Sequence, residues 1–548
     1  MRIEPPSLRR QTVAIGLFLA AATVFNTYPQ AFHLSSAVGS HGDALFSVWR
    51  LSWVAHAIVT APFQLFDANI FYPQRGTLAY SDALLLPAIT AAPLQWSQLP
   101  PVLVYNVVLL ATFFLSALSA CLFVRWLTGS LAGGLIAGMA FAFSSHQLEH
   151  FDRLDVQLTF FIPLALWAIH RIALRGRWRD GLILGALVTG QIYSGIYNGV
   201  FLVTFIACVA PLVILVERRS TTRSTVPIIG VSLIVALLAA IPYLLPYLHN
   251  RIVLGDRSVE EIQAYSATYG DFLHAHLNNV VYGTTLGLAS GGSSERFLFP
   301  GVLLVALAAC GIRPRARPMS LVYLAGFLFA FEMSRGLNSA LYTWWHDHVF
   351  IYRGLRAPAR FDALVQLTLG VLAGFGVDRV RTAITTRRMR AAVLAALMIG
   401  VAVEYWGRPE LRAIENPSPI YKWLRRQPPG PVLVLPAPEP DRLFVSHDVN
   451  YMVDSIGVWY PLLNGQSGFF PQSYLNLIGA LRTFPSREAV EYAVNAGARY
   501  VLIYERYMPD TYRRVIAQAA VSPRLSLVAR YPDGTGEIAV YRVGDAPP

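Results

Sequence analysis

The sequence predicts a polytopic α-helical membrane protein with about eleven transmembrane helices and a small C-terminal α/β domain outside the membrane. Of its 548 residues, 55% are hydrophobic and only 14% are charged, and the mean hydropathy is +0.46. That composition is too apolar for an ordinary soluble protein. Apolar stretches of membrane-spanning length recur over residues 1–406, and short strand-like runs replace them over 407–548. Two domains are therefore expected, with a large outer loop at 30–101 in the first.

The positions of the spans follow from the thickness of the bilayer. A hydrocarbon core of about 30 Å needs roughly 20 helical residues, and fewer where flanking side chains reach the interface. The spans are expected at 11–29, 102–127, 131–145, 156–174, 180–193, 196–216, 226–247, 297–313, 319–334, 362–379 and 390–406. No small-residue cleavage site follows the first of them, so we interpret it as a retained span and not as a signal peptide.

The basic residues give the orientation. With a cytoplasmic N-terminus, each predicted inside connection is short and basic, as the positive-inside rule requires. These connections carry Arg125, Arg171, Arg175, Arg177, Arg179, Arg218, Arg219, Arg223, Arg313, Arg315, Arg317, Arg379, Arg381, Arg387, Arg388 and Arg390. The C-terminal domain then lies outside the cytoplasm. Because the positive charge of +12 is divided among these short clusters, it does not indicate a nucleic-acid partner.

The C-terminal segment has the pattern of a small α/β domain. Short apolar runs bounded by proline or glycine are typical of buried strands. The predicted strands are Pro431–Pro436, Tyr500–Tyr504 and a hairpin that joins Ser526–Tyr531 to Glu537–Val543. Between them, Arg487–Ala496 has helical periodicity and ends at a glycine.

The first outer loop contains an acidic residue beside a helical pattern. Asp43 precedes Ala44–Val59, in which Phe46, Trp49 and Trp53 fall on one helical face. We expect this helix to lie along the outer interface, with its tryptophans at the level of the headgroups. Asp43 is either an N-cap of that helix or a general base at the mouth of a membrane cavity.

Other residues on the outer side are candidates for contacts with substrate. Asp82 precedes a further apolar helix, where it also fits a helix cap. Tyr193 and Tyr197 lie at an outer membrane boundary, which an aromatic belt explains, and stacking on a sugar is the alternative.

The third and fourth spans are joined by a turn with many polar residues. His146 and His150 have the spacing i, i+4, with Glu149 between them. This spacing resembles that of metal ligands, although it is not the helical motif of zinc proteases. We expect these histidines to line a substrate cavity or to form a polar turn facing outward, and a metal site is the less favoured alternative. A divalent cation is therefore the one cofactor that the sequence leaves open.

Three arginines on the outer side depart from the topology rule. Arg353, Arg356 and Arg360 stand just before the tenth predicted span. Guanidinium groups bind phosphate through paired hydrogen bonds, so a lipid phosphate or pyrophosphate is the expected partner. Ordinary headgroups of membrane lipids are the alternative.

Together these features resemble the GT-C superfamily of integral-membrane glycosyltransferases. The features are Asp43 in the first outer loop, the helix that follows it and the eleven-span layout. Three further segments, Asn69–Asp82, Arg353–Phe361 and Pro461–Pro471, are similar to bacterial GT-C-like membrane proteins. The resemblance implies a location in the bacterial inner (plasma) membrane.

The resemblance also implies an activity. The protein would transfer a sugar from a polyprenyl-phosphate donor to a lipid, glycan or protein acceptor on the outer face, as an inverting enzyme of the hexosyltransferase class. Asp43 would be the base, and Arg356 and Arg360 would hold the donor phosphate. Unlike many members, this sequence has no second acid beside Asp43. The alternative is a GT-C-shaped protein without catalysis, acting as a lipid-binding scaffold or transporter, although the inverted repeats of transporters are not found.

Overall fold

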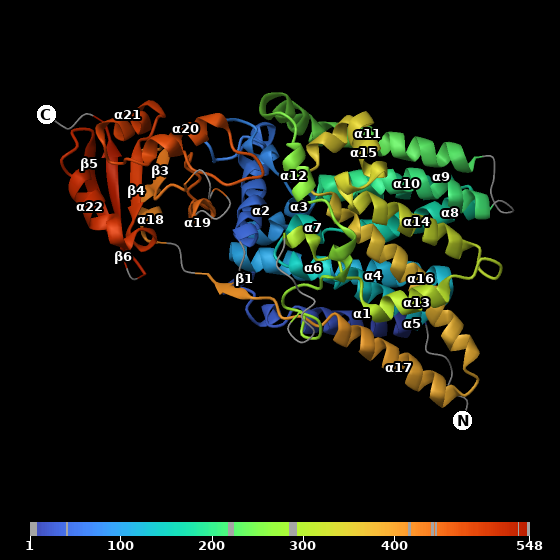
Figure 1. Ribbon diagram of the computed structural model, residues 1–548. Helices are drawn as coiled ribbons and strands as arrows, with labels where there is room; N and C mark the ends of the chain where they lie inside the picture. The colour runs from blue at the N-terminus through green and yellow to red at the C-terminus, as the bar shows by residue number, and fades with distance from the viewer. Residues whose placement is uncertain are drawn as a thin grey trace. The chain divides into compact units, whose positions relative to one another are not determined.

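The computed structural model describes residues 8–39, 42–217, 224–283, 293–414, 418–439, 443, 447–534 and 536–544 (Figure 1). The chain forms two compact units. Unit 1 comprises residues 1–39, 106–244 and 256–411, and unit 2 comprises 40–105, 245–255 and 412–548. Most of the first outer loop thus belongs to the same unit as the C-terminal segment, whereas the sequence assigns that loop to the transmembrane domain.

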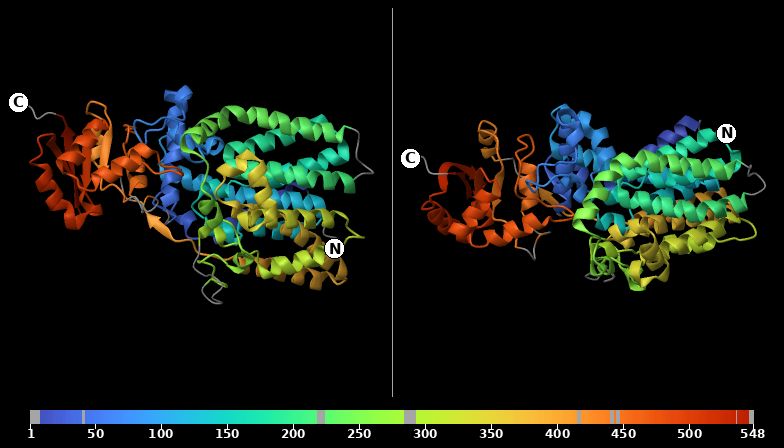
Figure 2. Two further views of the ribbon diagram at one scale, coloured as in Figure 1. Left: turned by 45° about the horizontal axis from the view of Figure 1, so that its top comes forward. Right: turned by 90° about the horizontal axis from the view of Figure 1, so that it is seen from above.

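Unit 1 is a bundle of helices. Its helices are α1 (Leu8–Asn26), α4 (Pro101–Thr128), α5 (Leu131–Ala142), α6 (Ser145–Glu149), α7 (Leu154–Gln157), α8 (Phe161–Arg175), α9 (Trp178–Ser194), α10 (Ile196–Val216), α11 (Thr225–Leu254), α12 (Val259–Ala264), α13 (Val302–Gly311), α14 (Met319–Ser334), α15 (Ala340–His348), α16 (Asp362–Ala383) and α17 (Arg387–Glu404). α4 and α11 each extend into unit 2 at one end. The long helices of unit 1 run side by side in every view (Figures 1 and 2).

The helices of unit 1 agree with the predicted positions of the spans. Each of the eleven apolar stretches contains a helix. Within the described residues, five helices are long and apolar enough to cross a membrane: Pro101–Thr128, Leu154–Arg175, Ile196–Val216, Thr225–Leu254 and Pro358–Ala383. The chain is therefore a multi-pass membrane protein, while eleven crossings and their orientation stay predictions. The basic connection at Arg218–Arg223 lies outside the described residues.

α16 is the central helix of unit 1. It packs against α5, α13 and α14, and every residue from Asp362 to Asp378 is buried. A helix that is apolar on all sides is typical of such a position. It approaches α13 closely because Gly376 faces the backbone carbonyl of Leu307, and Gly311 faces that of Leu372. Small residues allow helix backbones in membranes to meet in this way.

We expect Gly376→Ala to destabilise unit 1 by about 1–3 kcal/mol, because its new methyl group would overlap the carbonyl oxygen of Leu307. The measurement is thermal unfolding of the purified protein in detergent. Gly230→Ala in α11 is the matched control, since no atom lies within 4 Å of the position of its Cβ. An equal loss of stability in both variants would contradict the close packing of α13 and α16.

Unit 2 combines helices with a four-stranded sheet. Its helices are α2 (Gly42–Thr60), α3 (Leu85–Trp96), α18 (Ile420–Leu424), α19 (Asp448–Asp454), α20 (Gln472–Leu481), α21 (Arg487–Asn495) and α22 (Pro509–Ala519). Its strands are β3 (Val432–Leu435), β4 (Tyr500–Tyr504), β5 (Leu525–Asp533) and β6 (Gly536–Val543), and they lie in the order β3-β4-β6-β5. β3 pairs parallel to β4, and the other pairs are antiparallel. The chain has two further short strands outside this sheet, β1 (Ala37–Gly39) and β2 (Leu411–Ala413). Strands and helix α21 occur where the sequence predicts them.

The aromatic face of α2 is buried within unit 2. Trp49 and Trp53 are almost inaccessible. The indole N–H of Trp49 donates to Asn69 Oδ1 at 3.2 Å, and that of Trp53 donates to the carbonyl of Leu65 at 2.8 Å. The prediction that these tryptophans lie among lipid headgroups is therefore wrong. Helical periodicity identifies an apolar face but does not distinguish a lipid partner from a protein one.

Asp448 is a buried carboxyl group in unit 2. The hydroxyl of Tyr474 donates to its Oδ2, and the amide of Asn464 donates to its Oδ1 at 3.1 Å. Burial raises the pKa of Asp448 to about 7, although these hydrogen bonds oppose the shift. Between pH 4 and 7 the folded state thus binds more protons than the unfolded state, and stability falls as the pH rises.

We expect the unfolding temperature of unit 2 to fall between pH 5 and pH 8, with a loss of about 3 kcal/mol from this one group. Asp448→Asn removes this dependence, because an amide does not titrate. Thermal unfolding of the full chain at several pH values provides the measurement. Asp510→Asn, at an exposed aspartate, should leave the dependence unchanged. If the Asp448 variant keeps it too, this carboxyl is not its source.

Candidate functional site

Two histidines of unit 1 lie together in the turn after α5. The hydroxyl of Ser144 accepts a hydrogen bond from the N–H of Gln147 and begins the short helix α6. His146 stands in the first turn of this helix, and His150 follows its last residue. Their rings are 4.4 Å apart and both are buried. The i, i+4 spacing seen in the sequence therefore does bring the two imidazoles together.

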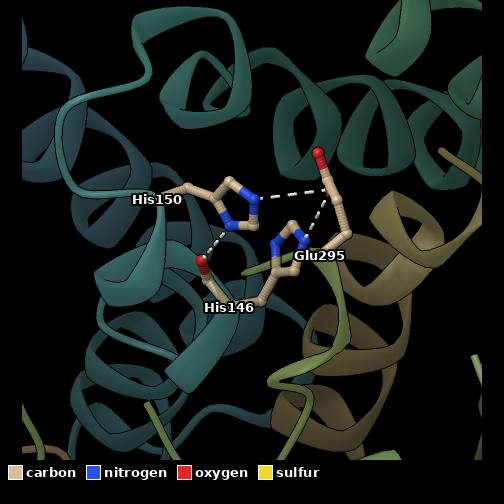
Figure 3. Close-up of side chains that lie close together, drawn as sticks. All are labelled: His146, His150 and Glu295. Carbon is tan, nitrogen blue, oxygen red and sulfur yellow. Dashed lines mark hydrogen bonds and ion pairs between the residues drawn. The ribbon is translucent and has the colours of Figure 1, made fainter. Parts of the chain in front are cut away.

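A carboxylate from a distant segment completes the cluster. Glu295 lies in a short 3₁₀ helix, Ser294–Arg296, and is buried. Its Oε2 is 3.6 Å from Nε2 of His146 and 3.4 Å from Nε2 of His150 (Figure 3). We call these three residues the histidine–glutamate cluster. Its three ligand atoms all lie within 4.8 Å of one another.

Arginine side chains hold the carboxylate from its other side. Arg360 donates from Nη2 to Oε1 of Glu295 at 2.6 Å and from Nε to both oxygens at 3.1 Å. Its Nη1 also bonds Asp155 at 3.1 Å, and Arg153 reaches Glu295 Oε1 at 3.1 Å. Arg360 is thus paired with two carboxylates inside unit 1 and is buried. Ion pairs this deep persist only with such complete pairing.

The charge states of the cluster follow from burial and from these neighbours. Burial, with a smaller contribution from the nearby His150, lowers the pKa of His146 to about 4, so His146 is neutral near pH 7. Burial alone would raise the pKa of Glu295. The charge of Arg360 and hydrogen bonds from the histidines outweigh it and hold that pKa well below its usual range. Glu295 is therefore a carboxylate.

The orientation of His150 directs its Nε2 at the carboxylate of Glu295. Its Nδ1 lies 2.9 Å from the carbonyl oxygen of His146, so this nitrogen carries the proton that it donates. Its Nε2 faces Glu295 Oε2 at 3.4 Å. Together with Nε2 of His146, these atoms present two imidazole nitrogens and one carboxylate oxygen within 4.8 Å of one another.

Two of the three predicted arginines lie close to Tyr197. The N–H of Arg356 donates to the hydroxyl of Tyr197 at 2.9 Å, and its Nη1 pairs with Glu261 at 3.3 Å. The guanidinium of Arg360 lies 5.0 Å from the centre of the Tyr197 ring. Arg353 is separate, because it bonds the backbone carbonyls of His346 and Asp347. Phosphate binding by these arginines stays a prediction.

The remaining predicted residues lie elsewhere. Tyr193 stacks on Tyr243 with ring centres 4.8 Å apart. Asp43 belongs to unit 2 and is the second residue of α2, so it lies inside the first turn and does not precede it. Asp82, also in unit 2, is not the cap of α3, since Leu84 occupies that position; the carbonyl of Asp82 instead accepts a hydrogen bond from Arg50 at 2.7 Å.

Known proteins resemble this chain in structure only. No family model and no curated protein sequence matches it. The arabinofuranosyltransferase AftD from mycobacteria matches 99% of this chain with a TM-score of 0.65 and 16% sequence identity. The match covers 42% of AftD, so this chain spans about two fifths of that protein. The chain has the GT-C fold.

Other matches to GT-C proteins are weaker. They are the oligosaccharyltransferase AglB from Archaeoglobus fulgidus (TM-score 0.47, 12% identity, 98% of this chain and 74% of AglB) and ArnT from Cupriavidus metallidurans (TM-score 0.48, 12% identity, 98% of each chain).

Within this GT-C fold, sequence reasoning found only part of the cluster. The two histidines were visible from their spacing. Glu295 and Asp155 were not singled out as site residues, because each stands in a polar segment without a periodic pattern. The one signal that could have found Glu295 is its place in an outer segment close to the start of an apolar span, where an acid is costly unless it has partners.

Proposed function

We propose that this chain is a membrane glycosyltransferase that transfers a sugar from a polyprenyl-phosphate donor to a lipid or cell-envelope glycan on the outer face. The GT-C fold supports the class of protein. The single observation that carries the proposal is the buried histidine–glutamate cluster with Arg360. Ionisable groups buried in a membrane protein are costly and are typical of functional sites.

We further infer that the histidine–glutamate cluster binds a divalent cation. Ligand atoms about 2.0–2.2 Å from zinc in a tetrahedral site lie roughly 3.4 Å apart. The observed separations of 3.4 Å and 3.6 Å match this spacing. Two imidazole nitrogens and one carboxylate are ligands that zinc and related ions accept, and three protein ligands leave a position open. Such a cation would supply positive charge for a phosphate group.

The residues themselves supply the other parts of the mechanism. Arg356 offers a guanidinium group to the donor phosphate, whose negative charge grows as the glycosidic bond breaks. Asp43 takes the proton from the acceptor hydroxyl, which then attacks the anomeric carbon from the side opposite the phosphate and inverts it. Arg153, Arg360 and Asp155 keep Glu295 in place.

The function is tested with radiolabelled polyprenyl-phosphate sugars. The purified chain is incubated in membrane lipids with each donor, and label transferred to lipid or glycan acceptors is measured. Transfer that requires Asp43 supports the proposal. Donor binding without any transfer would instead favour the non-catalytic alternative, a lipid-binding protein with the GT-C fold.

A further inference from the structure

Unit 2 contains a cavity of about 330 Å³ with aromatic walls. One wall is the segment Phe71–Pro73 of the first outer loop, and the other walls come from α20 and α21. Tyr492 and Asn495 are spaced i, i+3 on α21, so the ring and the amide lie on the same side of that helix. The cavity is within the lower part of the size range of ligand pockets, about 300–1,000 Å³.

The wall at Phe71–Pro73 is held firmly in place. The N–H of Phe71 donates to the carbonyl of Asn464 at 3.1 Å, and that of Tyr72 donates to Leu462 at 2.9 Å. Phe71 has a positive φ of 57°, which costs energy for a residue with a large side chain. The ring of Tyr72 packs closely over Gly497, whose own φ is +90°. The local backbone thus fixes where these rings lie.

The lining of the cavity is mostly apolar and aromatic, with two polar side chains and no charged one. Tyr72 and Tyr492 are 40% and 37% exposed, so their ring faces are open to a ligand. Ser473 and Asn495 add a hydroxyl and an amide, which both donate and accept hydrogen bonds. Among the described residues that line the cavity, none is Arg, Lys, Asp or Glu.

We propose that this cavity binds a neutral sugar residue of a glycan. A sugar ring presents apolar C–H groups on its faces, which suit the negative faces of aromatic rings, and hydroxyl groups at its edge, which suit an amide and a hydroxyl. A phosphate or carboxylate would find no opposite charge there. An acyl chain would offer no hydrogen-bond partner to the amide of Asn495.

Binding of a glycan by unit 2 does not depend on catalysis. Its assignment as the place where the acceptor glycan is recognised does rest on the proposed function. The two ideas are therefore tested separately, because sugar binding is measured without any donor and without turnover.

The experiment uses the full chain in lipid nanodiscs and saturation-transfer NMR. The probes are neutral oligosaccharides of glucose, mannose, galactose and arabinose, with glucose 6-phosphate as the charged counterpart. We expect at least one neutral probe to receive saturation at its ring C–H protons. Tyr492→Ala and Asn495→Ala should each raise its Kd about tenfold, whereas Tyr492→Phe, which keeps the ring, should change it less than about threefold.

Two control variants make the outcome decisive. Phe63→Ala removes a fully exposed aromatic ring of unit 2 that does not line the cavity, and it should leave binding unchanged. Asp43→Asn should also bind normally, because it removes only the proposed base. If the unmodified chain binds sugar but does not transfer it, the proposed function alone is refuted. The inference fails if no neutral probe binds, if glucose 6-phosphate binds in preference, or if Tyr492→Ala binds as tightly as the unmodified chain.

Discussion

Asp43→Asn is expected to reduce sugar transfer by about 10²–10⁴-fold, because the amide cannot accept the proton of the acceptor hydroxyl. The fold should survive. Asp43 is half-buried in the first turn of α2, where loss of its charge weakens the interaction with the helix dipole by only about 0.3–1 kcal/mol. The measurement is the rate of label transfer at saturating donor, together with the unfolding temperature of the variant.

The matched control is Asp67→Asn in the same outer loop. Oδ1 of Asp67 accepts a hydrogen bond from the N–H of Gly76 at 2.8 Å, and an asparagine oxygen can accept it equally. This control should therefore transfer sugar at the normal rate. If Asp43→Asn turns over at a rate close to that of the control, Asp43 is not the base and the assignment fails.

Glu295→Gln is expected to destabilise the protein by about 3–5 kcal/mol. The substitution keeps the shape of the side chain but removes the charge that two guanidinium groups share, and it leaves Arg360 buried with Asp155 as its one remaining carboxylate partner in the described residues. It also removes the anionic ligand from the histidine–glutamate cluster. Thermal unfolding in detergent and equilibrium binding of Zn²⁺ measure the two effects.

Glu491→Gln gives the comparison for an exposed ion pair. Glu491 pairs with Arg524 at 3.1 Å, and both side chains are 37% exposed, so its loss should cost at most about 1 kcal/mol. His150→Ala separates the two roles of the cluster, because it removes a metal ligand while the pairs of Glu295 with arginine remain. Normal Zn²⁺ binding by His150→Ala would rule out the cation site.

The helices were predictable because hydropathy is a local property of the chain. A helix lies in each of the eleven apolar stretches, and Tyr500–Tyr504 is a strand with the same bounds as predicted. What the apolar residues contact was not predictable. Trp49 and Trp53 have the spacing expected of an interfacial anchor, yet they pack against protein. A helical face that contacts lipid and one that contacts protein have the same periodicity, so the pattern does not distinguish them.

The site was predictable only where its residues are neighbours in the sequence. His146 and His150 lie one helical turn apart, so their spacing sufficed. Glu295 reaches them across 145 residues of chain, and only the tertiary fold sets that distance. Arg360 was expected to face a phosphate, but Glu295 and Asp155 already surround it. The sequence does not indicate whether an arginine pairs with the phosphate of a ligand or with a carboxylate of the protein itself.

The division of unit 2 between distant parts of the chain affects how the protein is made. Asn69 bonds the carbonyl of Tyr460, and 391 residues separate the two. At a ribosomal rate of about 5–20 residues per second, the outer loop waits roughly 20–80 s for its partner. During that interval Trp49 and Trp53 lack part of their covering. A nascent chain stalled or cut before the tail emerges would expose this aromatic surface, where chaperones and proteases could recognise it.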